Sequence, residues 1–272
     1  MPELPETETI ARDLHAAIVG TDISETLVLR ADVLRGVAPA DLPAWLTGRR
    51  IIRVWRRAKS VVISTDGGRH LVVTPRFTGA LIIGNAAART AYTCLIVSLG
   101  DGRALRYDDV RRLGTVAALN DAALLAWSAR LGPEPLDPEF TAERFSVCIR
   151  GSNRAIKAVL MDQGRLAGVG NIYANEALWR AGIRPSRRAT SLRGAERLAL
   201  HRELRAVLQE AVEARGTSFR DYRDAFGAQG GFAAQLKAYG RGGEPCARCG
   251  APLKSSHVIN GRATVWCASC QR

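Results

Sequence analysis

The chain has 272 residues, of which 47% are hydrophobic and 6% aromatic, so it is long enough for one large or two modest domains with real cores. No apolar run reaches the length that spans a bilayer, and the N-terminus lacks the basic and apolar regions of a secretory signal. We therefore expect a cytoplasmic protein without membrane contact. A formal net charge of +13 favours a polyanionic partner, most commonly nucleic acid; a ribosome-associated or merely basic protein is the alternative.

The chain begins Met-Pro-Glu-Leu-Pro-Glu. Removal of Met1 would leave Pro2 as a secondary amine, and an α-amino group with a reference pKa near ~8 is partly neutral at neutral pH. Such an amine can attack a carbonyl-like carbon and form an iminium, with Glu3 supplying the acid and base steps. The plainer interpretation is a helix start, because Pro5 suits the first turn and Glu6 the positive end of the helix dipole.

A helix is expected at residues 5–18, from apolar side chains at helical spacing. From about residue 21 to 119, β-branched runs recur every ten residues or so between turn signals, which predicts a sandwich or barrel. The expected strands cover 23–29, 51–55, 60–64, 71–73, 80–83, 92–98, 104–107 and 115–119. A short helical insertion is expected at 39–46.

The character of the sequence changes after Asn120. Helices are expected at 122–131, 141–150, 153–163, 172–182 and 192–214. A Gly-Pro break near Pro133 indicates a domain boundary. The glycine-rich turn 164–171 either brings backbone amides to a phosphate or makes a tight connection. Residues 216–240 contain five glycines and few apolar anchors, so we expect a mobile loop, either a functional lid or a disordered segment.

The last 27 residues contain four of the six cysteines, as Cys246-x-x-Cys249 and Cys267-x-x-Cys270 with 17 residues between the pairs. Two such pairs typically hold one structural zinc ion with four thiolates. The intervening segment suits a β-hairpin that turns at Asn260-Gly261.

Four motifs in this order resemble the formamidopyrimidine-DNA glycosylase and endonuclease VIII family of base-excision repair enzymes, over essentially the whole chain. They are the opening hexapeptide, Arg57-Ala58-Lys59, the stretch from Asp162 to Leu178, and the segment from Tyr239 to Arg272. Leu4 favours the formamidopyrimidine branch.

The resemblance implies an α+β fold with an N-terminal two-sheet β-sandwich and flanking helices over residues 1–133. A helical domain with a helix–two-turn–helix element and a lesion loop would cover 134–238, and a β-hairpin zinc finger 239–272. Damaged double-stranded DNA would bind in the cleft between domains. We expect a monomer with one structural Zn²⁺, in the bacterial cytoplasm at the nucleoid.

The resemblance also implies a bifunctional glycosylase and abasic-site lyase that acts on oxidised purines such as 8-oxoguanine and formamidopyrimidines. Pro2 would attack the anomeric carbon, displace the base and form an iminium, after which β- and δ-elimination would cut the strand. Glu3 would protonate the sugar ring oxygen and shuttle protons, and Glu6 would support the opened sugar. The implied catalytic residues are Pro2, Glu3, Glu6, Lys59 and Arg262.

Lys59, Asn171 and Arg262 would hold the phosphates that flank an extruded nucleotide. Without the resemblance, an exposed arginine such as Arg262 would not by itself indicate a phosphate contact. The resemblance adds Lys157 and Tyr173 to the DNA-binding residues. The implied lesion pocket consists of Glu176, Thr217 and Tyr222.

One stretch departs from the family pattern. Where the family usually reads His-Leu-Gly-Met-Ser-Gly, this chain reads Thr-Pro-Arg-Phe-Thr-Gly from residue 74. Phe77 stands at the methionine that fills the hole left by the extruded base, and Arg111 and Leu113 stand at its arginine and phenylalanine partners. An apolar wedge of either type can enter a base stack, so base extrusion should survive. Arg76 either replaces the phosphate contact of the missing histidine or is a solvated turn residue.

Two further hypotheses remain. The first keeps the lyase but changes the lesion to oxidised pyrimidines, bulky adducts or abasic sites alone. The second is a non-catalytic zinc-finger DNA-binding protein, against which Pro2, Glu3 and Lys59 argue together.

Overall fold

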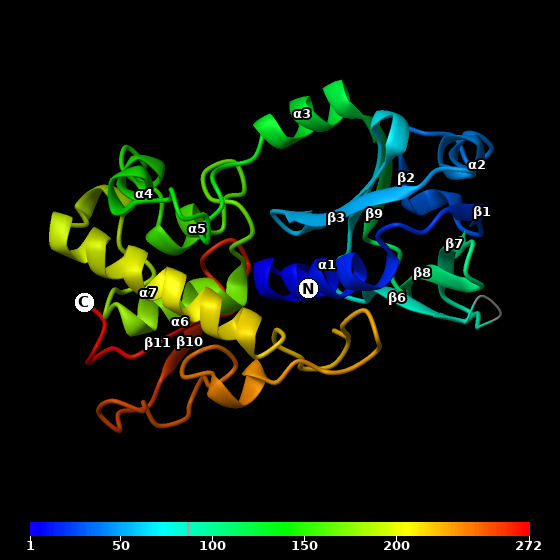
Figure 1. Cartoon of the computed structure of the whole chain (residues 1–272). Coiled ribbons are helices and arrows are strands. Elements are labelled where there is room, and N and C mark those ends of the chain that lie inside the picture. The colour runs from blue at the N-terminus through cyan, green and yellow to red at the C-terminus, as the bar shows by residue number, and fades with distance from the viewer. Residues whose placement is uncertain (86–87) are drawn as a thin grey trace. The chain divides into compact units, whose positions relative to one another are not determined.

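The computed structural model describes residues 1–85 and 88–272. They form two compact units, each made from two pieces of chain (Figure 1). Unit 1 comprises Met1–Ala129 and Ala214–Gly231, and unit 2 comprises Arg130–Glu213 and Phe232–Arg272. None of the helices within these described ranges is long and apolar enough to cross a membrane.

Unit 1 contains two β-sheets. One is antiparallel and has the order β1 (Ile23–Val28), β7 (Thr93–Leu99), β8 (Arg103–Asp109) and β6 (Gly79–Asn85). The other has the order β2 (Leu34–Arg35), β9 (Thr115–Asn120), β5 (Arg69–Thr74), β4 (Ser60–Thr65) and β3 (Ile51–Arg57). Only the β2–β9 pair is parallel among the described strands. The helices of unit 1 are α1 (Leu4–Ile18), α2 (Asp41–Leu46) and α3 (Asp121–Ala129).

The core of unit 1 lies between these sheets and under α1, which packs on β3 and β4. Ile10, Leu14 and Ile18 recur at helical spacing and are completely buried. They join one apolar cluster with side chains of both sheets, including Leu71 of β5 and Leu105 of β8. A sheet with one apolar face must bury that face against another layer, which explains the sandwich. The predicted two-sheet fold with flanking helices is confirmed.

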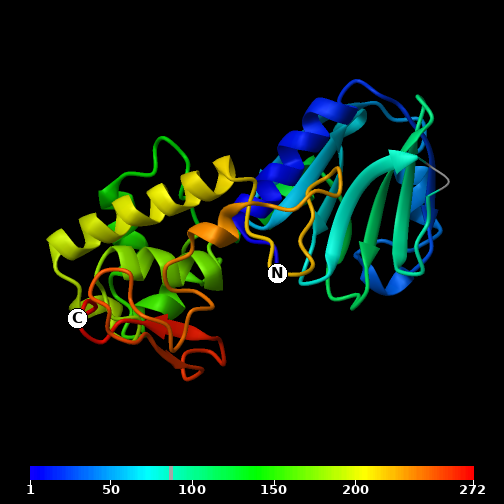
Figure 2. The same ribbon diagram turned by 90° about the horizontal axis from the view of Figure 1, so that it is seen from below.

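Unit 2 is helical and ends in a small hairpin. Its helices are α4 (Ala142–Ile149), α5 (Ile156–Leu160), α6 (Asn171–Arg180) and α7 (Gly194–Glu213). Leu200, Leu204, Leu208 and Ala211 form a fully buried stripe on α7, which packs on α4 and α6 (Figure 2). The hairpin pairs β10 (Lys254–Ser256) with β11 (Thr264–Trp266), and β11 contacts α6. Short 3₁₀ turns lie at Ala31–Val33, Asp66–Gly68, Ala189–Ser191 and Phe232–Gln235.

Two sequence-based expectations differ from the structure. The helix expected over residues 153–163 forms only at Ile156–Leu160, because Ala155 makes an extended bridge with Arg188. The segment 216–240, expected as one loop, is divided between the two units at Gly231 and contains the 3₁₀ turn Phe232–Gln235. Its expected mobility stays a prediction. The three domains predicted from the motifs stay a prediction.

Candidate active site

The first turn of α1 is closed by a reciprocal cap between two acidic residues. The N–H of Glu3 donates to Oε2 of Glu6 at 2.7 Å, and the Glu3 side chain accepts the backbone N–H of Glu6. Their exposed fractions are 2% and 1%, and Pro2 is also buried. Because a helix N-terminus stabilises negative charge, this turn can hold two carboxylates directly beside the start of the chain.

The α-amino group of Met1 is partly buried beside this turn, although the residue as a whole is 37% exposed. Burial lowers its pKa below the ordinary value of 8.0, although Glu3, Glu6 and Asp221 act in the opposite direction. The positive charge of Lys59 acts in the same direction as burial and therefore lies near the terminus. A lowered amine pKa increases the neutral, nucleophilic fraction at neutral pH.

Lys59 owes its position to a tight turn between β3 and β4. The preceding residue, Ala58, has a positive φ of 53°, and its carbonyl accepts a hydrogen bond from Thr7 Oγ1 of α1 at 3.5 Å. Thr7 Oγ1 also bonds to the carbonyl of Glu3 at 2.8 Å. The turn that carries Lys59 is therefore tied to the same helical turn as Glu3.

Residues 214–231 reach the same place through Glu6. Oε1 of Glu6 accepts the N–H of Thr217 at 2.7 Å, and Tyr222 Oη donates to the Glu6 carbonyl at 3.4 Å. Gly216 has a φ of +84°, and a Cβ there would lie 3.0 Å from Cγ of Glu6, so a larger residue would strain the backbone and press on Glu6. The structure thus brings Thr217 and Tyr222, both predicted in the lesion pocket, to the first turn of α1.

An ion-pair clamp holds the same segment to α1. The Arg215 guanidinium bonds to Asp13 of α1 at 2.7 Å and to Asp224 at 2.5 Å. Asp224 is 1% exposed, and it also accepts the N–H groups of Phe226 and Ala228. These contacts fix the backbone of the segment while the ring of Phe226 stays 60% exposed.

Two neighbouring turns present the predicted wedge residues. Arg111 stacks over the ring of Phe77, with Cζ 4.7 Å from the ring centroid, and Leu113 is 40% exposed. Asp109, which is 1% exposed, organises both turns by accepting bonds from Thr78 Oγ1 at 2.6 Å and from the Arg111 N–H at 3.2 Å. Phe77 adopts a positive φ of 41°, a conformation that costs energy outside glycine and is held here by these contacts.

In unit 2, the predicted phosphate-binding residue Asn171 is the first residue of α6. The glycine-rich turn before it is folded around Gln163, whose side chain donates to the carbonyl of Val169 at 2.8 Å and accepts the N–H of Gly168 at 2.9 Å. This arrangement presents the first amides of α6 at one end of the turn. Such a helix N-terminus is suited to a phosphate group.

Three of the residues predicted at the DNA or at the lesion are completely buried. Lys157 donates to the carbonyl of Ala263 at 2.7 Å and to Thr264 Oγ1 at 2.8 Å. Glu176 accepts three backbone N–H groups, those of residues 237, 238 and 239. Tyr173 packs its ring on Phe232. Lys157 thus contacts the hairpin, and Glu176 holds the segment before it. Contact of the three residues with DNA or a lesion stays a prediction.

The four C-terminal cysteines converge. All four Sγ atoms lie within 4.8 Å of one another, and those of Cys249 and Cys267 are 3.5 Å apart. A tetrahedral zinc ion with Zn–S bonds near 2.3 Å would separate its sulfurs by about 3.8 Å, so the thiols of Cys246, Cys249, Cys267 and Cys270 fit a metal ion. Asn260 and Gly261 both have positive φ, as the predicted hairpin turn requires, and Arg262 is exposed directly after them.

Several organising residues were not predicted from the sequence. They bond to backbone groups of turns or of distant segments, or they place a charge near the N-terminus. These residues are Asp109, Gln163, Asn175 and Asp221. Asn175, for example, accepts the N–H of Val265 at 2.8 Å and donates to the carbonyl of Asn171. For Asn175 the sequence does offer a signal, because it is a polar residue inside an apolar helical pattern. Such a residue is normally buried only when its polar atoms have hydrogen-bond partners.

Comparison with known proteins agrees with this architecture. Residues 1–116 match the model of the formamidopyrimidine-DNA glycosylase N-terminal domain, and residues 131–223 match the formamidopyrimidine-DNA glycosylase H2TH domain. The chain is 43% identical to the formamidopyrimidine-DNA glycosylase of Heliobacterium modesticaldum, with all of both chains covered.

Solved structures give the same result. The MutM (Fpg) protein of Thermus thermophilus superposes with a TM-score of 0.89 at 39% identity, covering 99% of this chain and 98% of that one. The wild-type Lactococcus lactis Fpg bound to a DNA containing N7-benzyl-Fapy-dG superposes with a TM-score of 0.92 at 32% identity over all of both chains. The two-sheet unit, the helical unit and the four-cysteine hairpin together are those of a DNA glycosylase of base-excision repair. The chain belongs to the formamidopyrimidine-DNA glycosylase family.

Proposed function

We propose that this protein is a bifunctional DNA glycosylase and abasic-site lyase that removes oxidised purines, 8-oxoguanine and formamidopyrimidines, from double-stranded DNA. The observation that carries the proposal is the buried turn of α1, where Pro2, Glu3 and Glu6 lie together with the Lys59 charge beside them. Simple DNA binding needs neither a buried N-terminal amine nor a carboxylate pair at that amine.

In the proposed reaction, the amine of Pro2, exposed by removal of Met1, attacks C1′ of the damaged nucleotide. The bond from C1′ to the base breaks, and Glu3 protonates the sugar ring oxygen as the ring opens to an iminium. Loss of a C2′ proton then expels the 3′-phosphate by β-elimination, and a δ-elimination expels the 5′-phosphate. Water hydrolyses the iminium and restores the amine.

Glu6 is proposed as a positioning residue, which holds the turn of Pro2 and Glu3 in a fixed position relative to Thr217. One of its carboxylate oxygens accepts the Glu3 N–H and the other accepts the Thr217 N–H, so a single side chain couples the nucleophile's turn to residues 214–231. Positioning of this kind can contribute several orders of magnitude to a rate.

We further propose that Lys59, Asn171 and Arg262 hold phosphates on either side of an extruded nucleotide, and that Phe77, Arg111 and Leu113 fill the space left in the stack. Arg76, exposed on the same turn as Phe77, is assigned a phosphate contact. The lesion is assigned to the surface formed by Thr217 and Tyr222. The lesion class is supported by the family and by the Fapy-dG derivative in the Lactococcus lactis complex.

The metal held by the four cysteines is proposed to be one zinc ion with a structural role. Four thiolates leave no ligand position for water, so the ion would fold the finger without entering the chemistry. We propose that the protein is a monomer and that its substrate is damaged duplex DNA. We also propose that it works in the cytoplasm at the nucleoid.

Borohydride trapping tests the mechanism. The protein would be incubated with duplexes that carry 8-oxoguanine, a formamidopyrimidine, an oxidised pyrimidine or an abasic site, and intact mass would show whether Met1 is removed. We expect covalent adducts with the first two and with the abasic site, located on Pro2 by peptide mapping.

The controls separate the alternatives. Glu3→Gln should reduce trapping on damaged bases strongly, whereas Glu25→Gln on the exposed part of β1 should not. An adduct with the abasic duplex alone would leave only a lyase, and preferential trapping on oxidised pyrimidines would change the lesion class. Absence of any adduct from protein that starts at Pro2 would overturn covalent catalysis.

A further inference from the structure

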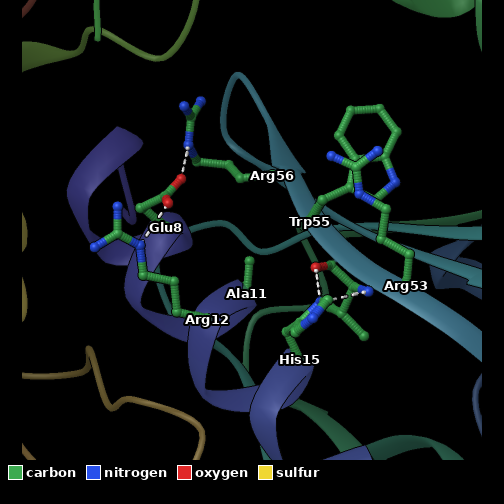
Figure 3. A pocket seen from close by; sticks show the side chains of 8 residues that line it. Glu8, Ala11, Arg12, His15, Arg53, Trp55 and Arg56 are labelled. Carbon is green, nitrogen blue, oxygen red and sulfur yellow. Dashed lines mark hydrogen bonds and ion pairs between the residues drawn. The ribbon is translucent and has the colours of Figure 1, made fainter. Parts of the chain in front are cut away.

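A pocket of about 410 Å³ lies within unit 1, on the side of α1 that faces the edge strand β3. Three arginines, His15 and Trp55 supply its polar and aromatic lining (Figure 3). None of the residues assigned above to catalysis or to DNA contact takes part in it. The volume is in the range of pockets that bind small ligands or single groups of larger ones.

The lining carries an excess of positive charge. Glu8 is its one carboxylate, and it accepts bonds from Arg12 Nε at 2.7 Å and from Arg56 Nε at 2.8 Å. Burial would raise the pKa of Glu8, but the charge and hydrogen bond of Arg56, aided by Arg12, hold that pKa below its ordinary value of 4.5. Glu8 is therefore ionised at neutral pH, and three guanidinium groups against one carboxylate leave two positive charges.

Two of these arginines keep donors directed to solvent. Arg53 stacks over Trp55 with Cζ 5.2 Å from the ring centroid, and its guanidinium has no hydrogen-bond partner among the described residues. Arg12 uses only Nε, and its side chain is 63% exposed. Stacking holds the plane of the Arg53 guanidinium in place, which lowers the entropy lost when its N–H edge binds an anion.

His15 contributes a further polar atom. Its Nδ1 lies 3.0 Å from the carbonyl oxygen of Val54 and 3.4 Å from the Val54 backbone nitrogen, so in either tautomer it bonds to one of these two groups on the outer edge of β3. Its Nε2 has no hydrogen-bond partner among the residues that the structure describes. The pocket thus offers two guanidinium forks and an imidazole nitrogen but no unpaired carboxylate, which matches a phosphate group.

We propose that this pocket binds a phosphate of the DNA backbone outside the damaged nucleotide, as an accessory contact of the enzyme. The inference rests on DNA being the substrate. The residues of α1 that line the pocket lie four to eleven positions after the start of the helix, or about 6–17 Å along its axis. A phosphate bound there is therefore a different one from those beside the reacting sugar, and it lengthens the DNA footprint.

Binding to undamaged duplexes of about 12 and about 30 base pairs tests the proposal separately from catalysis. The double variant Arg12→Ala, Arg53→Ala should bind the long duplex with a salt slope smaller by about 1, the value for one lost phosphate contact. Its slope on the short duplex should be unchanged. The control is Arg144→Ala, Arg202→Ala, which removes the same charge from exposed positions of α4 and α7 and should leave both slopes unchanged.

Free phosphate is the alternative ligand for this pocket, because it offers the same phosphate group as the DNA backbone. Inorganic phosphate and a 5′-mononucleotide should perturb the Trp55 fluorescence of the wild type but not of the double variant, with Trp55→Phe identifying the signal. Phosphate binding without a change in the long-duplex slope would make the pocket a site for free phosphate and overturn the DNA contact. The absence of both effects would overturn the site itself. Strand scission of damaged duplex by the same proteins reports the proposed function independently.

Discussion

Glu6 accepts the backbone N–H of Thr217 at 2.7 Å, across a sequence separation of 211 residues. The other carboxylate oxygen of Glu6 accepts the N–H of Glu3. The first helical turn and residues 214–231 therefore share one buried carboxyl group, and a change in that group alters the hydrogen bonds of both segments.

Glu6→Gln should lower the rate of base excision about 10- to 100-fold. The amide retains one acceptor and turns an NH₂ group toward one of two backbone N–H donors, and a lost hydrogen bond to a charged group costs about 1.5–3 kcal/mol. Single-turnover excision at saturating enzyme measures this directly. Glu25→Gln is the control, and an unchanged rate for Glu6→Gln would remove the coupling role.

Phe77→Ala should slow excision from paired duplex about tenfold or more, because unstacking a base step costs a few kcal/mol and the wedge offsets that cost. Cleavage at an abasic site, which has no base to extrude, should change much less. Leu113→Ala provides the comparison, since both residues stand in the proposed wedge but only Phe77 is stacked with Arg111. Equal loss on the two substrates would argue that Phe77 supports the turn and not extrusion.

Arg76→Ala should weaken DNA binding and reduce the salt slope by about 0.9, the change for one phosphate contact. Arg76 is exposed on the turn that carries Phe77, so its removal disturbs no packing. Titration of labelled duplex at several salt concentrations gives the slope. If the slope matches that of the wild type, Arg76 is only a solvated turn residue.

Local periodicity and spacing were sufficient for the strand-rich character of unit 1, as a sandwich or barrel, for the helix that starts near Pro5 and for the cysteine hairpin. The resemblance to the family was needed to choose the two-sheet sandwich. Contacts between distant segments were not accessible in the same way. Nothing near Thr217 marks it as a partner of Glu6, and the pattern around Asp109 indicates only the end of a strand although this residue joins two turns. Burial also depends on the whole fold, so the sequence does not show that Lys157 and Glu176 are completely buried. Their expected place beside the DNA and the lesion stays a prediction.

Lys157→Met should destabilise the attachment of the hairpin and weaken DNA binding without removing the metal. Methionine keeps the apolar stem but removes the two bonds of the ammonium, at a cost of about 1–3 kcal/mol. The Ala263 carbonyl then keeps only the longer bond from Asn175, and the Thr264 hydroxyl keeps only its bond to the Arg262 carbonyl. Arg262 follows the hairpin turn directly, so it should lose its fixed position. Hydrogen exchange of the hairpin amides and duplex affinity are the measurements. Lys254→Met, an exposed change on β10, is the control, and protection equal to the wild type would contradict the role.

Removal of the metal should abolish tight DNA binding while leaving unit 1 folded. The small cluster around Cys246 and Cys267 includes Trp179 of α6 and Val265 of β11, so the thiols hold together a core too small to persist alone. Chelation, or Cys249→Ser, should release one equivalent of zinc, measured with a chromogenic chelator, and should expose the hairpin amides to exchange. Amides of β4 and β5 in unit 1 should keep their protection, since that core contains none of the four ligands. Arg262→Ala separates the two effects, because it should weaken DNA binding with the zinc retained. Full affinity in the zinc-free protein would show that the finger does not contribute to binding.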